Sequence, residues 1–347
     1  MQNIRSISFG ELLDFLKING EKPYRAGQIY DWLWKYCVSS FEQMNNLSQN
    51  LRELLANNFF IDSAKIIAQQ ISNDKTIKVV FELIDKKIVE GVIIPSEKRV
   101  TACISSQVGC ALGCKFCATG TLGFSRDLSV GEIYEQAFKL SQLSNEQYNI
   151  PLTNIVFMGM GEPLLNYKNV IGAISFLTSQ KGMGLSSKRI TISTSGIPAQ
   201  IKQLADDNIK VNLALSLHTA NPDVRKKLLP VANKYSLNEI TKSLKYYTSK
   251  LKLKVTFEYL LLSGINDTVD DAKALVAFCS NVASKVNIIE YNEVENLPFQ
   301  KSSENKTALF LKTVYEKKIN VKLRRSRGID IDAACGQLAN KQKKIIF

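Results

Sequence analysis

Residues 109–120 read GCALGCKFCATG and place Cys110, Cys114 and Cys117 at C-x3-C-x2-C spacing. Three thiolates on one short loop can hold a single iron–sulfur centre. A four-iron cubane takes four ligands, so this loop leaves one iron open to a substrate or cofactor. The alternatives are a zinc site or a chance cluster of cysteines. Zinc loops usually pair two C-x2-C units or add histidine. The chain's single histidine, His218, lies far along the sequence, so the spacing favours an iron–sulfur centre.

The composition is that of a globular protein. A chain of 347 residues with 45% hydrophobic residues can form one large domain and a small one. No apolar run reaches membrane-spanning length, and the N-terminus lacks the apolar stretch of a signal peptide. We therefore expect a cytoplasmic protein without a membrane partner. In that compartment, seven cysteines do not form a structural disulfide framework. The net charge of +13 favours a nucleic-acid partner, although a merely soluble basic surface would have the same charge.

The chain divides into two predicted regions, residues 1–94 and 95–347. Apolar residues recur at helical spacing up to about residue 60, and Ser48 is a plausible cap for a short helix. From residue 64 to 94, apolar and polar residues alternate, which predicts a small antiparallel sheet. We therefore expect an N-terminal helical accessory region that contributes to RNA binding and carries a β extension.

From about residue 99, strands alternate with helices. One of these helices is expected from Ser129, as its cap, to Leu143. This alternation implies a parallel sheet with right-handed crossovers, and six such units fit an open, partial (β/α)6 barrel of the α/β class. The predicted strands lie at 99–106, 154–164, 189–196, 210–218, 253–262 and 285–292, with a possible last strand at 320–328.

Small and polar residues stand where these strands end, the edge at which barrels assemble their sites. The segment MGMGEPL, which contains Gly161 and Glu162, can be a ligand-binding turn or only a tight connection between strand and helix. A lone histidine at such an edge is more often a hydrogen-bonded structural group than a catalyst. The candidates at this edge are Cys110, Gly161, Glu162, Ser193, Ser216, His218 and Asn292.

The four remaining cysteines differ in their surroundings. Cys335 lies in the polar, glycine-flanked stretch GIDIDAACGQL, whereas Cys37 and Cys279 lie among apolar residues and are expected in the core. Cys103 lies in a predicted strand. It can be a core residue or a functional one, and its sequence environment does not decide between the two.

Several motifs in order resemble known enzymes. The cysteine loop resembles the signature of the radical S-adenosylmethionine (SAM) superfamily, in which SAM chelates the open iron. CISSQVGCALGCKFCATGTLGF, GMGEPLLN, STSGIP, SLH and GIDIDAACGQL together resemble the RlmN family, and the likeness covers nearly the whole chain. Members of that family methylate carbon 2 of adenosine in the peptidyl-transferase region of 23S rRNA, and the adenosine 3′ of the anticodon in some tRNAs. The related Cfr enzymes methylate carbon 8 and share the cysteine loop and the DIDAACGQL motif.

The resemblance assigns a role to each motif position. It implies that Cys335 carries the methyl group, that Cys103 is its disulfide partner, and that Glu90 is a proton acceptor. From its own surroundings, Glu90 is equally an exposed acid on a hairpin. The resemblance also implies a 4Fe–4S cluster on Cys110, Cys114 and Cys117, and SAM contacts by Gly161, Glu162, Ser193, Ser216, Leu217, His218 and Asn292.

The implied reaction follows from the chemistry of adenine. Carbon 2 lies between two ring nitrogens and is too electron-poor to attack the methyl group of SAM, so a radical route is needed. Cys335 would take a methyl group from one SAM, and a second SAM would supply the radical. Cys103 would then release the product by forming a disulfide with Cys335, which a flavodoxin or ferredoxin system would reduce. Either Glu90 or Cys103 would remove the proton on carbon 2.

The partners implied are 23S rRNA and tRNA, bound by a monomer. Arg324, Arg325 and Arg327 precede the Cys335 motif and could hold phosphates, or they could be solvated surface residues. Lys17, Lys22 and Arg25 could grip folded RNA. Two alternatives to the RlmN activity are a Cfr-like carbon-8 methylase and an iron–sulfur RNA-binding protein without turnover, which would need neither Cys335 nor Cys103.

Overall fold

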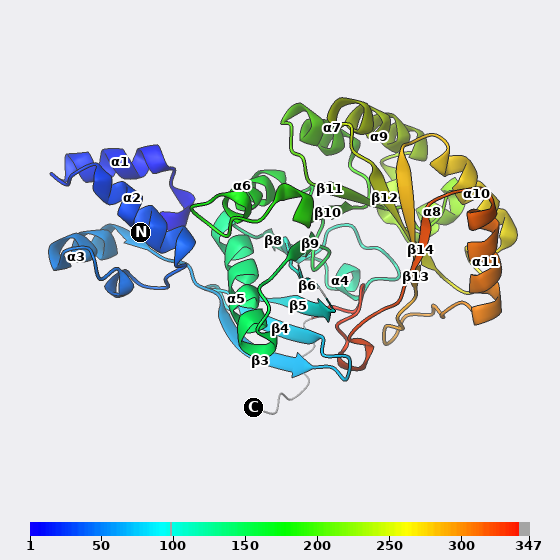
Figure 1. Ribbon diagram of the computed structural model, residues 1–347, viewed down its shortest axis with the longest axis horizontal. Coiled ribbons are helices and arrows are strands. Elements are labelled where there is room, and N and C mark those ends of the chain that lie inside the picture. The colour runs from blue at the N-terminus through cyan, green and yellow to red at the C-terminus, as the bar shows by residue number, and fades with distance from the viewer. Residues whose placement is uncertain (98, 340–347) are drawn as a thin grey trace.

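The computed structural model describes residues 1–97 and 99–339, so the end of the predicted barrel region, residues 340–347, lies outside the described part. A single ten-stranded sheet forms its centre, and seven adjacent strands of that sheet run parallel in chain order (Figure 1). This arrangement confirms the predicted α/β fold. The parallel strands are β6 (Arg99–Cys103), β9 (Asn154–Phe157), β10 (Ile190–Thr194), β11 (Asn212–Ser216), β12 (Val255–Leu261), β13 (Ser284–Glu290) and β14 (Val321–Arg324).

Helices connect successive parallel strands and complete six β/α units before β14. Their apolar sides cover the sheet, and leucines such as Leu140, Leu204 and Leu244 are fully buried. The helices are α5 (Val130–Tyr148), α6 (Tyr167–Thr178), α7 (Pro198–Asp206), α8 (Pro222–Leu228), α9 (Leu237–Leu251), α10 (Val269–Cys279) and α11 (Glu304–Glu316).

Helix α5 starts as its sequence predicts and ends later. Ser129 accepts a hydrogen bond from the backbone of Glu132, and the Glu132 carboxylate accepts one from the backbone of Ser129. The predicted end at Leu143 falls short because the final residues, SNEQY, carry no apolar periodicity. The helix continues until Asn149 adopts a left-handed conformation with φ of 51°.

The predicted antiparallel extension is present, and it continues the main sheet. Strands β3 (Lys65–Ile71), β4 (Ile77–Glu82) and β5 (Ile88–Ser96) pair antiparallel, and β5 pairs with β6, where Val92 lies opposite Cys103. Residue 94, the predicted boundary between the two regions, lies inside β5. Hydrogen bonds of one sheet therefore join these regions, and their division at residue 94 stays a prediction.

The N-terminal helices form a group at one end of the molecule, drawn in blue in Figure 1. Ser8 and Ser48 cap the first and the third of these helices, and the Ser48 cap agrees with the sequence. The helices are α1 (Phe9–Ile18), α2 (Tyr24–Tyr30), which continues as a π-helical turn (Asp31–Lys35), and α3 (Gln49–Asn58). Two short strands, β1 (Gln2–Asn3) and β2 (Phe59–Phe60), pair beside them.

A buried arginine ties this N-terminal group to the barrel. Arg5 is 4% exposed and donates to the Asp62 carbonyl oxygen at 2.8 Å and to the Val38 carbonyl oxygen at 3.0 Å. Its Nη1 also lies 3.1 Å from Oε2 of Glu135 on α5. Next to this contact, Trp34 stacks on Phe176 of α6 at 3.6 Å between ring centroids. Within the described residues, no helix is long and apolar enough to cross a membrane.

Replacing Arg5 with methionine is expected to lower the free energy of unfolding by about 3–5 kcal/mol, because the change leaves the Glu135 carboxylate buried without its guanidinium. Both tryptophans, Trp32 and Trp34, lie in the N-terminal group, so tryptophan fluorescence during urea denaturation reports this effect. The control is Lys17→Met, because Lys17 and its partner Asp14 are exposed by 59% and 74%. The control should lose less than about 1 kcal/mol. Equal losses in the two variants would contradict a buried anchor at Arg5.

Candidate active site

The three clustered cysteines are held by a small hairpin that follows β6. Strands β7 (Gln107–Gly109) and β8 (Phe124–Asp127) pair antiparallel, and the loop between them carries the cysteines and the short helix α4 (Ala118–Thr121). Gly109 has φ of +76°, and a Cβ there would lie 1.9 Å from the Gly123 oxygen, so only glycine closes the hairpin. The backbone N–H of Cys110 donates to that same oxygen at 2.8 Å.

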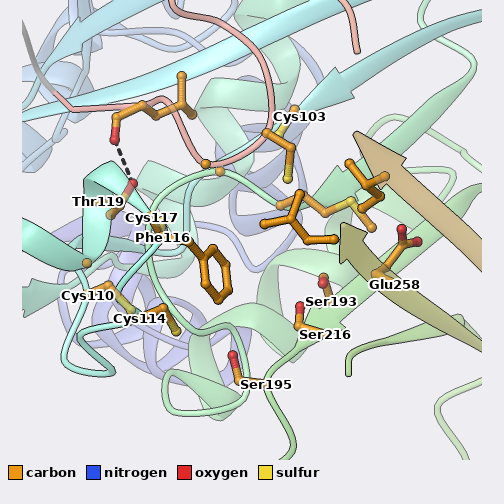
Figure 2. A pocket seen from close by; sticks show the side chains of 18 of the residues that line it. Cys103, Cys110, Cys114, Phe116, Cys117, Thr119, Ser193, Ser195, Ser216 and Glu258 are labelled. Carbon is orange, nitrogen blue, oxygen red and sulfur yellow. Dashed lines mark hydrogen bonds between the residues drawn. The ribbon is translucent and has the colours of Figure 1, made fainter. Parts of the chain in front are cut away.

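Cys110, Cys114 and Cys117 all line one pocket at the carboxyl ends of the parallel strands. Figure 2 shows Cys110 and Cys114 on one side of this pocket, with Ser193, Ser216 and Glu258 across from them. Burial raises the pKa of Cys110 to about 12, and it also raises the pKa values of Cys114 and Cys117. All three groups are therefore neutral thiols at pH 7 until a metal displaces their protons.

The three thiols fit a cluster better than a single ion. Among residues 1–97 and 99–339, no three histidine, cysteine or acidic side chains converge closely enough to hold one metal ion. A four-iron cluster takes one thiolate at each ligated iron, so its ligands lie further apart than those of a single ion. The three thiols line one pocket, and their role as ligands of the cluster stays a prediction.

Glu162 lies at the bottom of this pocket, after β9. It is 3% exposed, and its carboxylate accepts hydrogen bonds from the backbone of Ser195 at 2.8 Å and of Leu164 at 3.1 Å. Burial raises the pKa of Glu162 to about 7, against the opposing effect of these hydrogen bonds. The side chain can therefore accept from a cationic amine or, when protonated, donate to a ligand.

Gly161 serves the protein's own packing as well as the pocket. Its φ is +99°, and a Cβ there would lie 2.5 Å from Cβ of Gln107 on β7. The Gln107 side-chain oxygen in turn accepts from the backbone of Glu162 at 2.8 Å. The glycine thus lets the turn after β9 dock against the hairpin that carries the cysteines.

His218 lines the pocket in a single defined tautomer. Its Nδ1 accepts from the backbone N–H of Leu260 at 3.1 Å, so Nε2 carries the hydrogen. Its ring meets the edge of Phe116, on the cysteine loop, with 4.8 Å between centroids. Burial first, and the charge of Arg225 second, lower the pKa of His218 to about 3. His218 is therefore a neutral, fixed side chain that does not transfer protons near neutral pH.

Two predicted SAM-contacting residues do not line the pocket. Leu217 is fully buried, and its backbone N–H donates to the Glu258 carbonyl oxygen at 3.0 Å. Asn292, beyond the end of β13, uses its side-chain nitrogen to contact the Cys335 carbonyl oxygen at 3.4 Å. Ser193 and Ser216 do line the pocket, as does Ser195, which the sequence analysis passed over although it lies in the same STSG motif.

The C-terminal segment brings Cys335 back to the cysteine loop. The backbone N–H of Ala118 donates to the Gly336 oxygen at 2.7 Å, and the Thr119 hydroxyl donates to the Leu338 oxygen at 2.7 Å (Figure 2). The upstream end of the segment is fixed to the turn between β3 and β4, where the Asp330 carboxylate accepts from the Ser72 hydroxyl at 2.6 Å. Cys335 therefore lines the same pocket as the three clustered cysteines.

Cys103 is a pocket residue and a strand residue at once. It ends β6 at 8% exposure and lines the pocket, where Cys335 and Arg324 are close enough to affect its charge. Burial raises the pKa of Cys103 to about 12 and also raises that of Cys335, while Arg324 opposes both shifts. Both thiols are free, and they approach from opposite ends of the barrel sequence.

Arg324 lies in the pocket, whereas the nearby Arg325 and Arg327 are exposed. It lines the pocket, with Nη1 3.8 Å from Oε2 of Glu258 and 3.6 Å from the sulfur of Met158. Its guanidinium is therefore directed at the cysteines' pocket. Arg327 lies 4.0 Å from Asp74, and the predicted phosphate contacts of Arg325 and Arg327 stay a prediction.

Glu90 is buried, so the alternative of an exposed acid on a hairpin is wrong. It is 1% exposed, and its Oε2 accepts from the backbone of Ala339 at 3.0 Å. Lys78, on the neighbouring strand β4, lies 3.9 Å from its Oε1. Because Val92 lies opposite Cys103, Glu90 and Cys103 project from the same face of the sheet. The C-terminal segment covers this face and explains the burial, which no local sequence pattern reveals.

Two family models match the chain. Residues 2–61 match the ribosomal RNA large subunit methyltransferase N-terminal domain, and residues 104–278 match the radical SAM superfamily. A probable dual-specificity RNA methyltransferase RlmN of Cytophaga hutchinsonii is 51% identical over 98% of this chain and 93% of its own length. One of Flavobacterium johnsoniae is 48% identical over 99% of both chains. The chain belongs to the RlmN family.

A solved structure agrees with this membership in RlmN. The crystal structure of a radical SAM methyltransferase from Sphaerobacter thermophilus superposes with a TM-score of 0.91 at 35% identity, covering 97% of this chain and 99% of that one. The protein is thus a radical SAM RNA methyltransferase. Membership in the superfamily implies a 4Fe–4S cluster and SAM, and the three thiols of the cysteine loop suit that cluster.

The tautomer and charge of His218 can be measured directly, because it is the only histidine in the chain. In protein labelled with 15N-histidine, one pair of ring nitrogens is expected, with the hydrogen on Nε2. Since the pKa of His218 is about 3, these signals should not move between about pH 8 and about pH 5. A midpoint near the ordinary value of about 6.5 would show that the ring is solvated.

Proposed function

We propose that the protein methylates carbon 2 of adenosine in 23S rRNA and in tRNA, through a methyl group carried on Cys335. The observation that supports this most is the convergence of five cysteines on one pocket from two distant parts of the chain: Cys103, Cys110, Cys114 and Cys117 from one, and Cys335 from the other. A protein that only bound RNA through an iron–sulfur centre would need no thiols there beyond those of the cysteine loop.

The cysteine loop would hold the cluster, with SAM on the open iron, and together they supply the methyl group and a hydrogen-abstracting radical when bound. Glu162, Ser193 and Ser216 line the pocket beside the loop and would bind the polar groups of SAM. His218 would offer a neutral N–H, since burial keeps its pKa low. Two molecules of SAM per turnover follow from this scheme, because one methylates Cys335 and another generates the radical.

Cys335 would act first as a nucleophile, and so its thiol must lose its proton. Cys335 is exposed at the surface of the pocket; desolvation by the surrounding walls raises its pKa, whereas the nearby guanidinium of Arg324 favours the thiolate. The position of Arg324 in the pocket, rather than on the outer surface, supports this role. Asn292 would hold the backbone of Cys335, and Thr119 that of the residues after it, in place.

Cys103 would act last. Once the methylene carbon is bonded to carbon 2 and that carbon has lost its proton, the Cys103 thiolate would attack the Cys335 sulfur. A sulfur–sulfur bond would form as the sulfur–carbon bond breaks, a proton would complete the methyl group, and the unpaired electron left by the radical addition would return to the redox centre. The resulting disulfide needs two electrons to reopen, for which a flavodoxin or ferredoxin system is a suitable donor. Either Cys103 or Glu90 would remove the proton on carbon 2, and the pocket position of Cys103 favours Cys103.

The choice of substrate rests on the relatives and on charge. The similar proteins carry the description dual-specificity RNA methyltransferase, and we extend it to this chain. A net charge of +13 suits a phosphate-rich partner. We expect a monomer that acts in the cytoplasm, with the N-terminal helices contributing to RNA binding.

The identity of the product tests this proposal. Anaerobic protein given SAM, a reductant and unmodified 23S rRNA or tRNA should form 2-methyladenosine, identified by mass spectrometry of digested RNA against authentic 2- and 8-methyladenosine. The Cys110→Ala variant is the control and should form neither. Formation of 8-methyladenosine would assign a Cfr-like activity instead. No product from either RNA, with intact cluster and SAM cleavage, would contradict the proposal.

Replacing Cys103 with alanine should trap the reaction before release. The bond between Cys335 and the base then has no thiol to break it, so a protein–RNA adduct should accumulate, stable in denaturant and visible as a shifted gel band. The adduct should require SAM and reductant and should vanish in the Cys103→Ala, Cys335→Ala double variant.

The matched control is Cys279→Ala, because Cys279 is a core cysteine at 5% exposure outside the pocket. It should turn over without an adduct. If Cys103→Ala also turns over freely, Cys103 has only a packing role in β6.

A further inference from the structure

Arg225 is a buried arginine behind the pocket. It lies on α8 at 1% exposure, and its Nη2 donates to the carbonyl oxygens of Ser195 at 2.8 Å and Ser216 at 3.2 Å. Those two oxygens stand at the ends of neighbouring strands β10 and β11. Helix α8 also contacts the cysteine loop directly, since the backbone of Lys115 donates to the Leu228 oxygen at 2.9 Å. Arg225 thus lies between the strand ends and the cysteine loop.

This guanidinium lacks a counter-charge. Its Nε and Nη1 are buried and meet no hydrogen-bond partner, and no carboxylate within the described part of the chain forms an ion pair with it. Burial lowers the pKa of Arg225 to about 10, so it remains a cation at pH 7. Buried charges in proteins are normally paired, because an unpaired one costs several kcal/mol. An anion is therefore missing beside Arg225.

Cys114 supplies the position of that anion. Ser195, whose carbonyl oxygen accepts from Arg225, places its hydroxyl beside the Cys114 thiol. The residue after Cys114, Lys115, is hydrogen-bonded to the helix that carries Arg225. As a thiol Cys114 is neutral, but as a ligand of a cluster it is a thiolate, and three thiolates together with the cluster form a net anionic centre. Arg225 does not line the pocket, whereas Cys114 does, so the cluster loop lies between Arg225 and a ligand in the pocket.

We propose that Arg225 is the counter-charge of the iron–sulfur cluster, a positioning residue that makes the cluster easier to reduce. The proposal rests on the assigned cluster and not on the identity of the RNA base. Reduction adds an electron to a centre that is already anionic, and a nearby buried cation favours that step. Solvent ions screen a buried charge poorly, so the effect should exceed that of any lysine on the surface of the same helix.

The experiment is a redox titration of the cluster in the full chain, followed by electron paramagnetic resonance, without SAM or RNA. Arg225→Met should shift the reduction potential to a more negative value, and Arg225→Lys, which keeps the charge, should shift it less. The matched control is Lys226→Met, which removes the neighbouring exposed charge on α8 and should leave the potential unchanged. A wild-type potential in Arg225→Met, or an equal shift in Lys226→Met, would overturn the proposal.

Iron content provides a second measurement in case Arg225→Met does not retain a cluster. Loss of iron from Arg225→Met and Arg225→Gln, but not from Arg225→Lys, would support a need for charge at this position. Loss of iron from all three variants would overturn the proposal. Arg225→Lys keeps the positive charge, so the shape of the arginine side chain, and not its charge, would then explain why the cluster is retained. Neither readout depends on methyl transfer, so failure here is distinct from failure to form 2-methyladenosine.

Discussion

The active site depends on two hydrogen bonds that join the cysteine loop to the C-terminal segment. The Ala118 backbone and the Thr119 hydroxyl hold the oxygens of Gly336 and Leu338, although the Thr119 and Leu338 positions are 219 residues apart in the chain. The Asn292 side chain adds a contact to the Cys335 oxygen, and the Glu90 carboxylate accepts from the backbone of Ala339. With these contacts, the thiol that would carry the methyl group shares a pocket with the cluster ligands and with Cys103. The rest of the fold holds these two segments together. The cysteine loop follows the first parallel strand, β6, and the turn between β3 and β4 binds Asp330 of the C-terminal segment.

Burial sets the chemistry of that pocket. It raises the pKa of every cysteine there, and it raises the pKa of Glu162 to about 7. It also leaves polar atoms without hydrogen-bond partners: Oε2 of Glu258, which lies 3.8 Å from Nη1 of Arg324, and Nε and Nη1 of Arg225 behind the pocket. Such atoms cost free energy in a folded protein unless a ligand or a nearby charge compensates.

The sequence predicts the barrel well because its signals are local. Alternating apolar runs locate the parallel strands, and Ser129 and Ser48 mark the starts of helices with a mechanism, the side-chain cap. The features that the sequence does not predict depend on contacts between residues that are far apart in the chain. Glu90 stands on an alternating hairpin that looks half exposed, and only the returning C-terminal segment buries it. Arg225 belongs to no sequence motif. Its role becomes visible only when the ends of β10 and β11 and the cysteine loop are seen to meet around it. Arg324 likewise reads as one of three surface arginines until β14 is placed at the sheet edge beside β13, from which its guanidinium reaches Glu258 on β12.

Two arginines divide the five thiols of the pocket between two tasks. Arg225 lies behind Cys114, where it can compensate thiolates that a cluster keeps permanently charged. Arg324 lines the pocket with Cys103 and Cys335, which the proposed mechanism charges only at particular steps. Arg225 is 1% exposed, whereas Arg324 keeps 36% of its side chain exposed. Solvent therefore screens the charge of Arg324 more strongly than that of Arg225.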